Sequence, residues 1–101
     1  MKIKFNGKDI DVKYTFNSFR YMEDFDMKNL EELDRKPFKI IGITSDLLYG
    51  AVNYSPNNKY SKEEVLKHIE YVMDNEDITD LLTILMDLLE ESSFFKNLQK
   101  K

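Results

Sequence analysis

The chain has 101 residues, 42% hydrophobic and 13% aromatic, which favours one globular domain over residues 1–101 rather than a disordered chain. Its formal net charge of −4 disfavours a nucleic-acid-binding surface, and the absence of cysteine excludes disulfides, a thiol nucleophile and a cysteine-based zinc site. No apolar run approaches the roughly 20 residues that span a bilayer, and the N-terminus lacks the apolar core of a signal peptide, so we expect no membrane partner.

Residues 2–16 have the pattern of a β-hairpin. Apolar and polar residues alternate over residues 2–5 and again over residues 10–16, which is the two-residue period of a strand with one buried face. Asn6-Gly7 lies between the two runs, and this dipeptide favours the positive φ angles of a tight turn. Because an isolated hairpin is marginal in water, we expect its apolar face, Phe16 included, to pack on helices.

Two short helices are predicted after the hairpin. The first begins at residues 17–18, where Asn and Ser can cap a helix, and the second covers residues 29–35, before the Lys36-Pro37 pair. The side chains expected to face inward from these two helices are Phe19, Met22, Phe25, Leu30 and Leu33.

A longer helix is predicted over residues 38–52, and its apolar residues cover most of its circumference. Gly42 and Gly50 each permit a close contact with another element. The pair Thr44-Ser45 leaves open a break in the helix and a fresh cap. The apolar positions expected on its buried sides are Phe38, Ile40, Ile41, Ile43, Leu47, Leu48, Ala51 and Val52.

Two further helices follow a loop over residues 53–60. Ser61 and Glu64 match a capping box, which predicts a helix to residue 75 with Val65, Ile69, Val72 and Met73 on its inner face. Asp77 or Thr79 then caps a helix over residues 78–91, the most apolar stretch of the chain. We expect that last helix to be the central element of the core. The fold class is therefore α+β and mostly helical: an N-terminal β-hairpin packed on a bundle of about four to five α-helices.

The residues that carry chemistry are few. His68 is the only histidine, and without a second histidine or a cysteine we expect it to be structural or solvated rather than a metal ligand. No Gly-x-Ser-x-Gly elbow and no glycine-rich phosphate loop occurs. The sequence therefore predicts a protein that is not an enzyme, with no catalytic residue, no cofactor and no metal.

Two features point to a partner instead. Seven acidic and no basic residues lie between Asp74 and Glu91; this acidic face either keeps the protein soluble or docks a basic partner. Phe94 and Phe95 are adjacent in the C-terminal tail, residues 92–101, with Leu98 just beyond. Either one of the two aromatics packs back on the hairpin or they form an exposed apolar patch, and such patches mark partner surfaces. Phe94, Phe95 and Leu98 are our candidates for partner binding.

Three segments resemble the tail assembly chaperones of Gram-positive siphophages: residues 14–24 (YTFNSFRYMED) after the hairpin, residues 47–51 (LLYGA) and residues 90–96 (EESSFFK). The resemblance extends over nearly the whole chain. It implies a small, largely helical α+β fold and a role in the host bacterial cytoplasm. Members of this family are thought to coat the long helical tape-measure protein before the tail tube polymerises.

The resemblance also implies a tail-tube partner, which a longer, frameshifted form of the protein recruits, and a possible homo-oligomer. Lys100 and Lys101 would suit an A-rich slippery site for that frameshift. The function expected from the sequence is thus a non-enzymatic tail assembly chaperone. The alternative is a small phage or prophage regulatory adaptor that binds a host protein through its acidic face.

Overall fold

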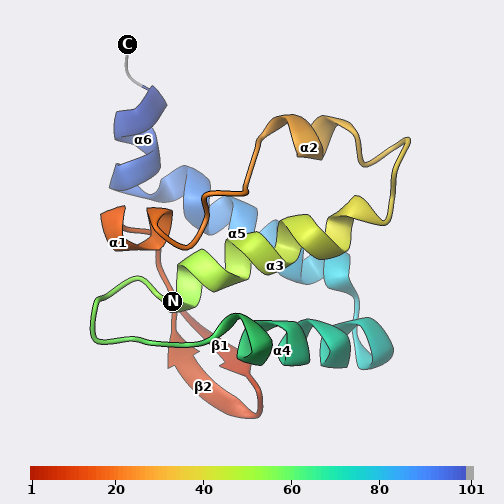
Figure 1. Cartoon of the computed structure of the whole chain (residues 1–101), viewed down its shortest axis with the longest axis horizontal. Coiled ribbons are helices and arrows are strands. Elements are labelled where there is room, and N and C mark those ends of the chain that lie inside the picture. The colour runs from red at the N-terminus through yellow and green to blue at the C-terminus, as the bar shows by residue number, and fades with distance from the viewer. Residues whose placement is uncertain (100–101) are drawn as a thin grey trace.

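The computed structural model describes residues 1–99 and has a two-stranded antiparallel sheet followed by six helices (Figure 1). The predicted α+β, mostly helical fold class is confirmed. Lys100 and Lys101, on which the frameshift expectation rests, lie outside the described residues. The elements in chain order are β1 (Lys2–Phe5), β2 (Lys8–Asp11), α1 (Phe16–Phe19), α2 (Lys28–Glu31), α3 (Lys39–Val52), α4 (Lys62–Asn75), α5 (Ile78–Glu91) and α6 (Ser93–Gln99).

The hairpin turns at the predicted dipeptide. Asn6 and Gly7 have φ angles of 49° and 84°, both in the left-handed region that a two-residue hairpin turn requires. The second strand ends at Asp11, earlier than expected. The chain turns towards α3 instead, where the Tyr14 hydroxyl donates a hydrogen bond of 2.8 Å to the carbonyl of Leu47. Burial raises the pKa of Tyr14 well above its ordinary value, so this hydroxyl stays a donor.

Helix α1 begins at Phe16, one to two residues before the predicted start. Thr15 is its cap, because its Oγ1 accepts from the amide of Ser18 and the Ser18 side chain accepts from the amide of Thr15. This start turns Ser18 to the core and leaves Phe19 49% exposed and Phe16 68% exposed, while Met22, just beyond the helix, is buried. The inward positions predicted for Phe16 and Phe19 were therefore wrong, while that of Met22 is confirmed.

Helix α2 is shorter than predicted and begins at Lys28, but Leu30 and Leu33 pack against the core as expected. Phe38 does not: its side chain is 86% exposed. It lies at the cap of α3, before the first helical residue, so the helical period does not set its direction. Lys39 at the start of α3 donates to Glu32 at 2.7 Å, which ties the segment after α2 to α3 and lowers the pKa of Glu32.

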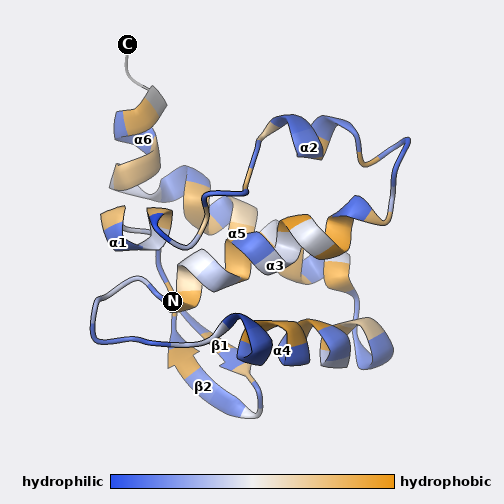
Figure 2. Cartoon of the chain, viewed as in Figure 1, coloured by the Kyte–Doolittle hydropathy of each residue, from blue (hydrophilic) through white to orange (hydrophobic). Residues whose placement is uncertain are grey.

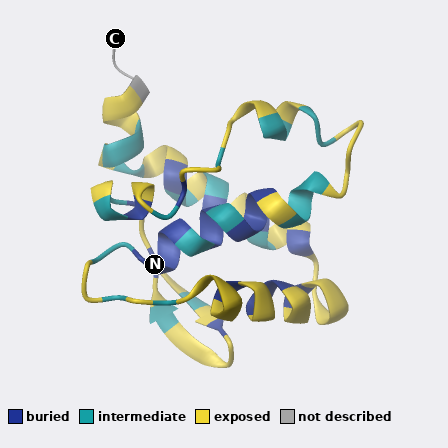
Figure 3. Cartoon of the chain, in the orientation of Figure 1, coloured by how far each residue is buried: buried dark blue, intermediate teal, exposed yellow. Residues whose placement is uncertain are grey.

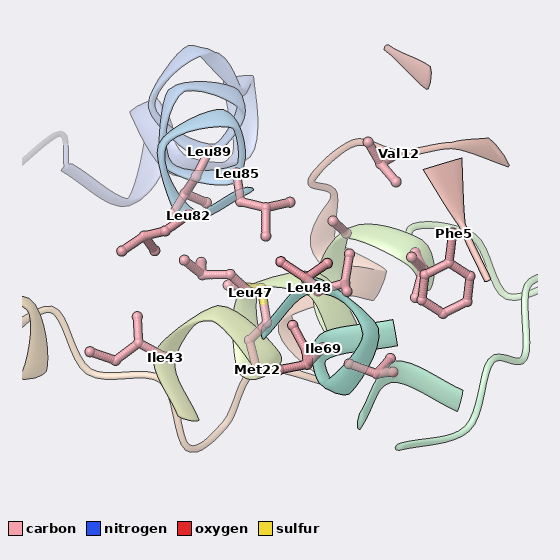
Figure 4. Close-up of a cluster of buried hydrophobic side chains, with 14 of the residues drawn as sticks. Phe5, Val12, Met22, Ile43, Leu47, Leu48, Ile69, Leu82, Leu85 and Leu89 are labelled. Carbon is pink, nitrogen blue, oxygen red and sulfur yellow. The ribbon is translucent and has the colours of Figure 1, made fainter. Parts of the chain in front are cut away.

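The central element of the core is α3, not the predicted helix α5. Helix α3 packs against α1, α2, α4 and α5 (Figure 1), and its buried residues lie on most sides of the helix (Figure 3). Leu47 and Leu48 lie between the leucines of α5 and the side chains of the hairpin and α4 (Figure 4). Helix α3 runs unbroken through Thr44 and Ser45, since the Ser45 hydroxyl donates to the carbonyl of Ile41 at 2.7 Å.

Helix α5 buries one stripe, packs Leu81, Met86 and Leu88 partly against the core, and leaves its polar side to solvent. Its buried residues recur every three or four positions, at Ile78, Leu82, Leu85 and Leu89, whereas Ile84 is 37% exposed. Asp77 is the cap, because its carboxylate accepts from the amide of Thr79 at 2.9 Å. This side of α5 packs mainly on α3, so α5 flanks α3 rather than filling the centre.

Helix α4 begins at the predicted capping box. Ser61 and Glu64 accept from each other's amides at 3.1 and 3.0 Å. The residues that face α3 are Val65, Ile69 and Val72, and the hydropathy of α4 divides accordingly into an apolar inner side and a polar outer side (Figure 2). Met73 is 45% exposed, contrary to expectation, because it lies about 80° round the helix from the centre of that stripe.

The two helical glycines of α3 predict opposite effects for the same substitution. A methyl group at Gly50 would overlap the Met22 side chain and lie 3.2 Å from the Ser18 carbonyl, whereas a methyl group at Gly42 would meet nothing within 4 Å. Gly50→Ala should therefore lower the free energy of unfolding by about 1–3 kcal/mol. Gly42→Ala should raise it by about 0.5–1 kcal/mol, since alanine favours the helix.

Urea unfolding of the two variants measures both effects. Changes of the same sign would contradict the close contact at Gly50. The close contact expected at Gly42 is not formed, because no atom of another element lies within 4 Å of a methyl group placed there. That expectation was wrong.

Candidate functional site: an aromatic groove between α1 and α6

The C-terminal segment, predicted to be a tail, forms helix α6 from Ser93. Ser92 separates it from α5 with an extended backbone, at φ −72° and ψ 141°. The Ser92 hydroxyl donates to the carbonyl of Leu89 at 2.7 Å and accepts from the amide of Phe95 at 3.1 Å. One serine therefore closes α5 and starts α6, which turns the chain back towards α1 (Figure 1).

An apolar groove lies between α1 and α6. It has a volume of about 450 Å³, and we call it the aromatic groove; its lining residues are Phe16, Phe19, Phe94, Asn97 and Leu98. The rings of Phe19 and Phe94 lie 6.1 Å apart between centroids, and those of Phe16 and Phe19 lie 6.4 Å apart. These spacings are typical of aromatic pairs, so the rings form one continuous surface.

The side chains of the groove are unusually open for their size. Phe16, Phe19 and Leu98 are 68%, 49% and 55% exposed, and Phe94 is half-buried beside them. None of the lining residues ionises. The groove therefore offers apolar contact and one side-chain amide, which suits binding rather than acid–base or nucleophilic chemistry.

The three predicted partner residues separate into two groups. Phe94 and Leu98 are four positions apart on one face of α6, and both line the groove. Phe95 points the other way and packs, half-buried, against the core cluster. The sequence left open whether one aromatic packs back or both are exposed, and the structure shows that Phe95 packs back on the core cluster while Phe94 joins an exposed patch.

Sequence reasoning missed Phe16 and Phe19 as groove residues, because it placed both inward. A signal was present in their spacing of three, which puts two residues on the same side of a helical turn. The spacing does not show whether that side of the helix faces the core or the solvent. The cap at Thr15 sets the start of α1, and with it which residues meet α3.

The acidic face is a second exposed feature. All seven carboxylate side chains from Asp74 to Glu91 are exposed, and within residues 1–99 none of them belongs to an ion pair. Their charges are thus available to solvent or to a basic partner. Like charges crowded in this way favour solubility and disfavour acidic partners.

Within residues 1–99, no cluster of three carboxylate or imidazole side chains has the spacing that would hold a metal ion. Every helix in the same range is too short or too polar to cross a membrane. Comparisons of the chain with protein-family models, with curated proteins and with solved structures find no match.

Proposed function

We propose that this chain is a non-enzymatic tail assembly chaperone of a siphophage, acting in the host bacterial cytoplasm. In this role it binds the tape-measure protein and helps to recruit tail-tube subunits during tail morphogenesis. The family is suggested by the resemblance of residues 14–24, 47–51 and 90–96. The observation that carries the proposal is the aromatic groove, whose open apolar lining suits an apolar client segment.

The proposed occupant of the groove is the apolar stripe of a helical tape-measure segment. The short helices α1 and α6 flank the groove. An amphipathic helix from a partner can bind in a groove of this kind by inserting its apolar side chains between them. Each contact is small, so a single copy releases readily when the tube protein arrives. Many copies along one client, with or without contacts between copies, supply avidity through effective concentration.

The recruitment of the tail-tube protein belongs to a proposed longer, frameshifted form. In that form the added segment follows α6, the helix that carries Phe94 and Leu98. The tape-measure protein and the tail-tube protein would then bind next to each other. This proximity would allow the tape-measure segment to pass from the chaperone to the tail tube.

Phe16→Ser should weaken binding of a tape-measure segment by about tenfold or more, which is the effect of removing one aromatic side chain at the centre of an interface. The matched control is Phe38→Ser: Phe38 is also an exposed phenylalanine at the start of a helix, but it is remote from the groove. Calorimetric titration with purified segments of the cognate siphophage tape-measure protein measures both variants. Equal affinities in the two variants, or no binding by the unaltered chain, would refute the proposal.

The alternative, a regulatory adaptor that binds a host protein, is favoured by the exposed acidic face. Binding through exposed carboxylates is screened by salt, whereas binding in an apolar groove is not. Raising sodium chloride from about 0.1 to 1 M, where the Debye length falls from about 10 to 3 Å, separates the two modes. Tape-measure binding that survives this change is the expected result, and its loss would favour the adaptor.

A further inference from the structure

The turn of the hairpin is held on α4 by one asparagine. The backbone amide of Asn6 donates to Nδ1 of His68 at 3.1 Å, and the Asn6 side-chain amide donates to the carbonyl of Glu64 at 3.0 Å. Because Nδ1 accepts a hydrogen bond, the imidazole is neutral and carries its proton on Nε2. The contact thus depends on the protonation state of the only histidine in the chain.

The imidazole of His68 is enclosed by aromatic rings. Its side chain is 6% exposed, its centroid lies 5.2 Å from that of Phe5, and the ring of Tyr71 stacks on it at 6.4 Å. An apolar setting of this kind disfavours the charged imidazolium. The enclosure therefore keeps the ring neutral and the hairpin docked.

A cleft of about 710 Å³ lies beside this contact, between the hairpin turn and the second half of α4. Asn6, Gly7, His68 and Glu76 all line it, and His68 and Glu76 also line a neighbouring cleft of about 550 Å³ on the side of α5. Glu76 is exposed and follows the last residue of α4. The Glu76 carboxylate can therefore pair with the His68 imidazolium once that ring moves away from Phe5 and Tyr71.

We propose that His68 is a pH-operated latch: in its neutral form it holds the hairpin turn on α4, and in its protonated form it releases Asn6 and pairs with Glu76, which opens the cleft. Protonation puts a hydrogen on Nδ1, so a donor then faces the donor amide of Asn6, and the contact becomes repulsive. The device is independent of what the aromatic groove binds.

Charged groups from three elements line the two clefts that His68 also lines. The cations are Lys2 and Lys4 of β1 and Lys67 of α4. The carboxylates are Glu70, Asp74 and Glu76 at the end of α4, with Asp77 and Asp80 at the start of α5. Carboxylates outnumber cations, so the clefts favour the imidazolium while the aromatic enclosure opposes it.

Burial is the larger influence: it lowers the pKa of His68 from 6.5, and Glu76 acts in the opposite direction. The unfolded chain therefore takes up the proton first as the pH falls, so the stability contributed by His68 is present above about pH 6.5 and lost below it. The hairpin is docked at neutral pH and released in acid.

Amide hydrogen exchange followed by NMR between pH 8 and 5 tests the latch, with each rate divided by the intrinsic rate at that pH. The protection factor of the Asn6 amide should fall by about threefold to tenfold, the worth of one hydrogen bond, in step with the imidazole signals of His68. The amide of Val72, in the buried stripe of α4, reports the stability of the whole fold, and its protection should stay above that of Asn6 at every pH because Asn6 exchanges through a local opening.

Two variants sharpen the test. H68N retains an acceptor near the position of Nδ1 but does not titrate, so the protection of Asn6 should become independent of pH. E76Q removes an exposed carboxylate and should shift the transition to lower pH. The latch is overturned if His68 titrates while the protection of Asn6 stays constant, or if H68N keeps the pH dependence of the unaltered chain. An unchanged midpoint in E76Q overturns the role of Glu76.

Discussion

Leu48→Ala is expected to lower the free energy of unfolding by about 2–5 kcal/mol, the usual cost of emptying a leucine site in a core. Leu48 is 0% exposed in the middle of α3 and lies among side chains of the hairpin and α4 (Figure 4). Because separate elements hold these neighbours in place, they cannot collapse fully into the cavity. Urea unfolding monitored by circular dichroism measures the loss.

Leu66→Ala is the matched control for this substitution. Leu66 also lies within a helix of 14 residues, α4, but it is 45% exposed. Its replacement should cost no more than about 1 kcal/mol, since little apolar surface leaves the interior. Equal losses in the two variants would mean that α3 is not the centre of the core.

Asn53→Ala should lower the free energy of unfolding by about 2–4 kcal/mol, because it leaves buried backbone groups without partners. Asn53 is 0% exposed at the end of α3. Its side-chain amide donates to the carbonyls of Tyr49 and Tyr60 at 2.9 and 3.2 Å, and its side-chain oxygen accepts from the amide of Tyr60 at 2.9 Å. One asparagine thus ends α3 and ties the following loop to it.

Asn57→Ala is the control for Asn53→Ala, since Asn57 lies exposed in the same loop. Its replacement should change stability by no more than about 0.5 kcal/mol. Hydrogen exchange supplies a local readout: the Tyr60 amide should lose protection in Asn53→Ala and keep it in Asn57→Ala. Retained protection at Tyr60 in Asn53→Ala would contradict the proposed role of the side chain.

The groove, too, depends on contacts between distant parts of the chain. Phe19 and Phe94 meet across 75 positions of sequence, since α1 packs on α3 and α6 packs on α5. A change that loosens α1 from α3 should therefore also alter the groove. Gly50→Ala, which crowds Met22 just after α1, is such a change, and we expect its client binding to weaken along with its stability.

Features set by near neighbours were predictable from the sequence. The Asn6-Gly7 turn, the Ser61–Glu64 capping box and the helix over residues 78–91 all lie where predicted. Each follows from interactions between residues two to four positions apart, and these act in the same way whatever the rest of the fold does. The fold class follows from the same local patterns.

Only the tertiary structure decided which element lies at the centre and which aromatics stay outside. Helix α1 has four residues, too few to show a period, so its contact with α3 and not its own pattern turned Phe16 and Phe19 outward. Helices α3 and α5 are both apolar, and the choice between them depended on how many neighbours each one meets. Phe94 and Phe95 were found as candidates from sequence alone, but their separation into groove and core depended on the turn at Ser92. Such outcomes come from packing between distant segments, which local sequence does not encode.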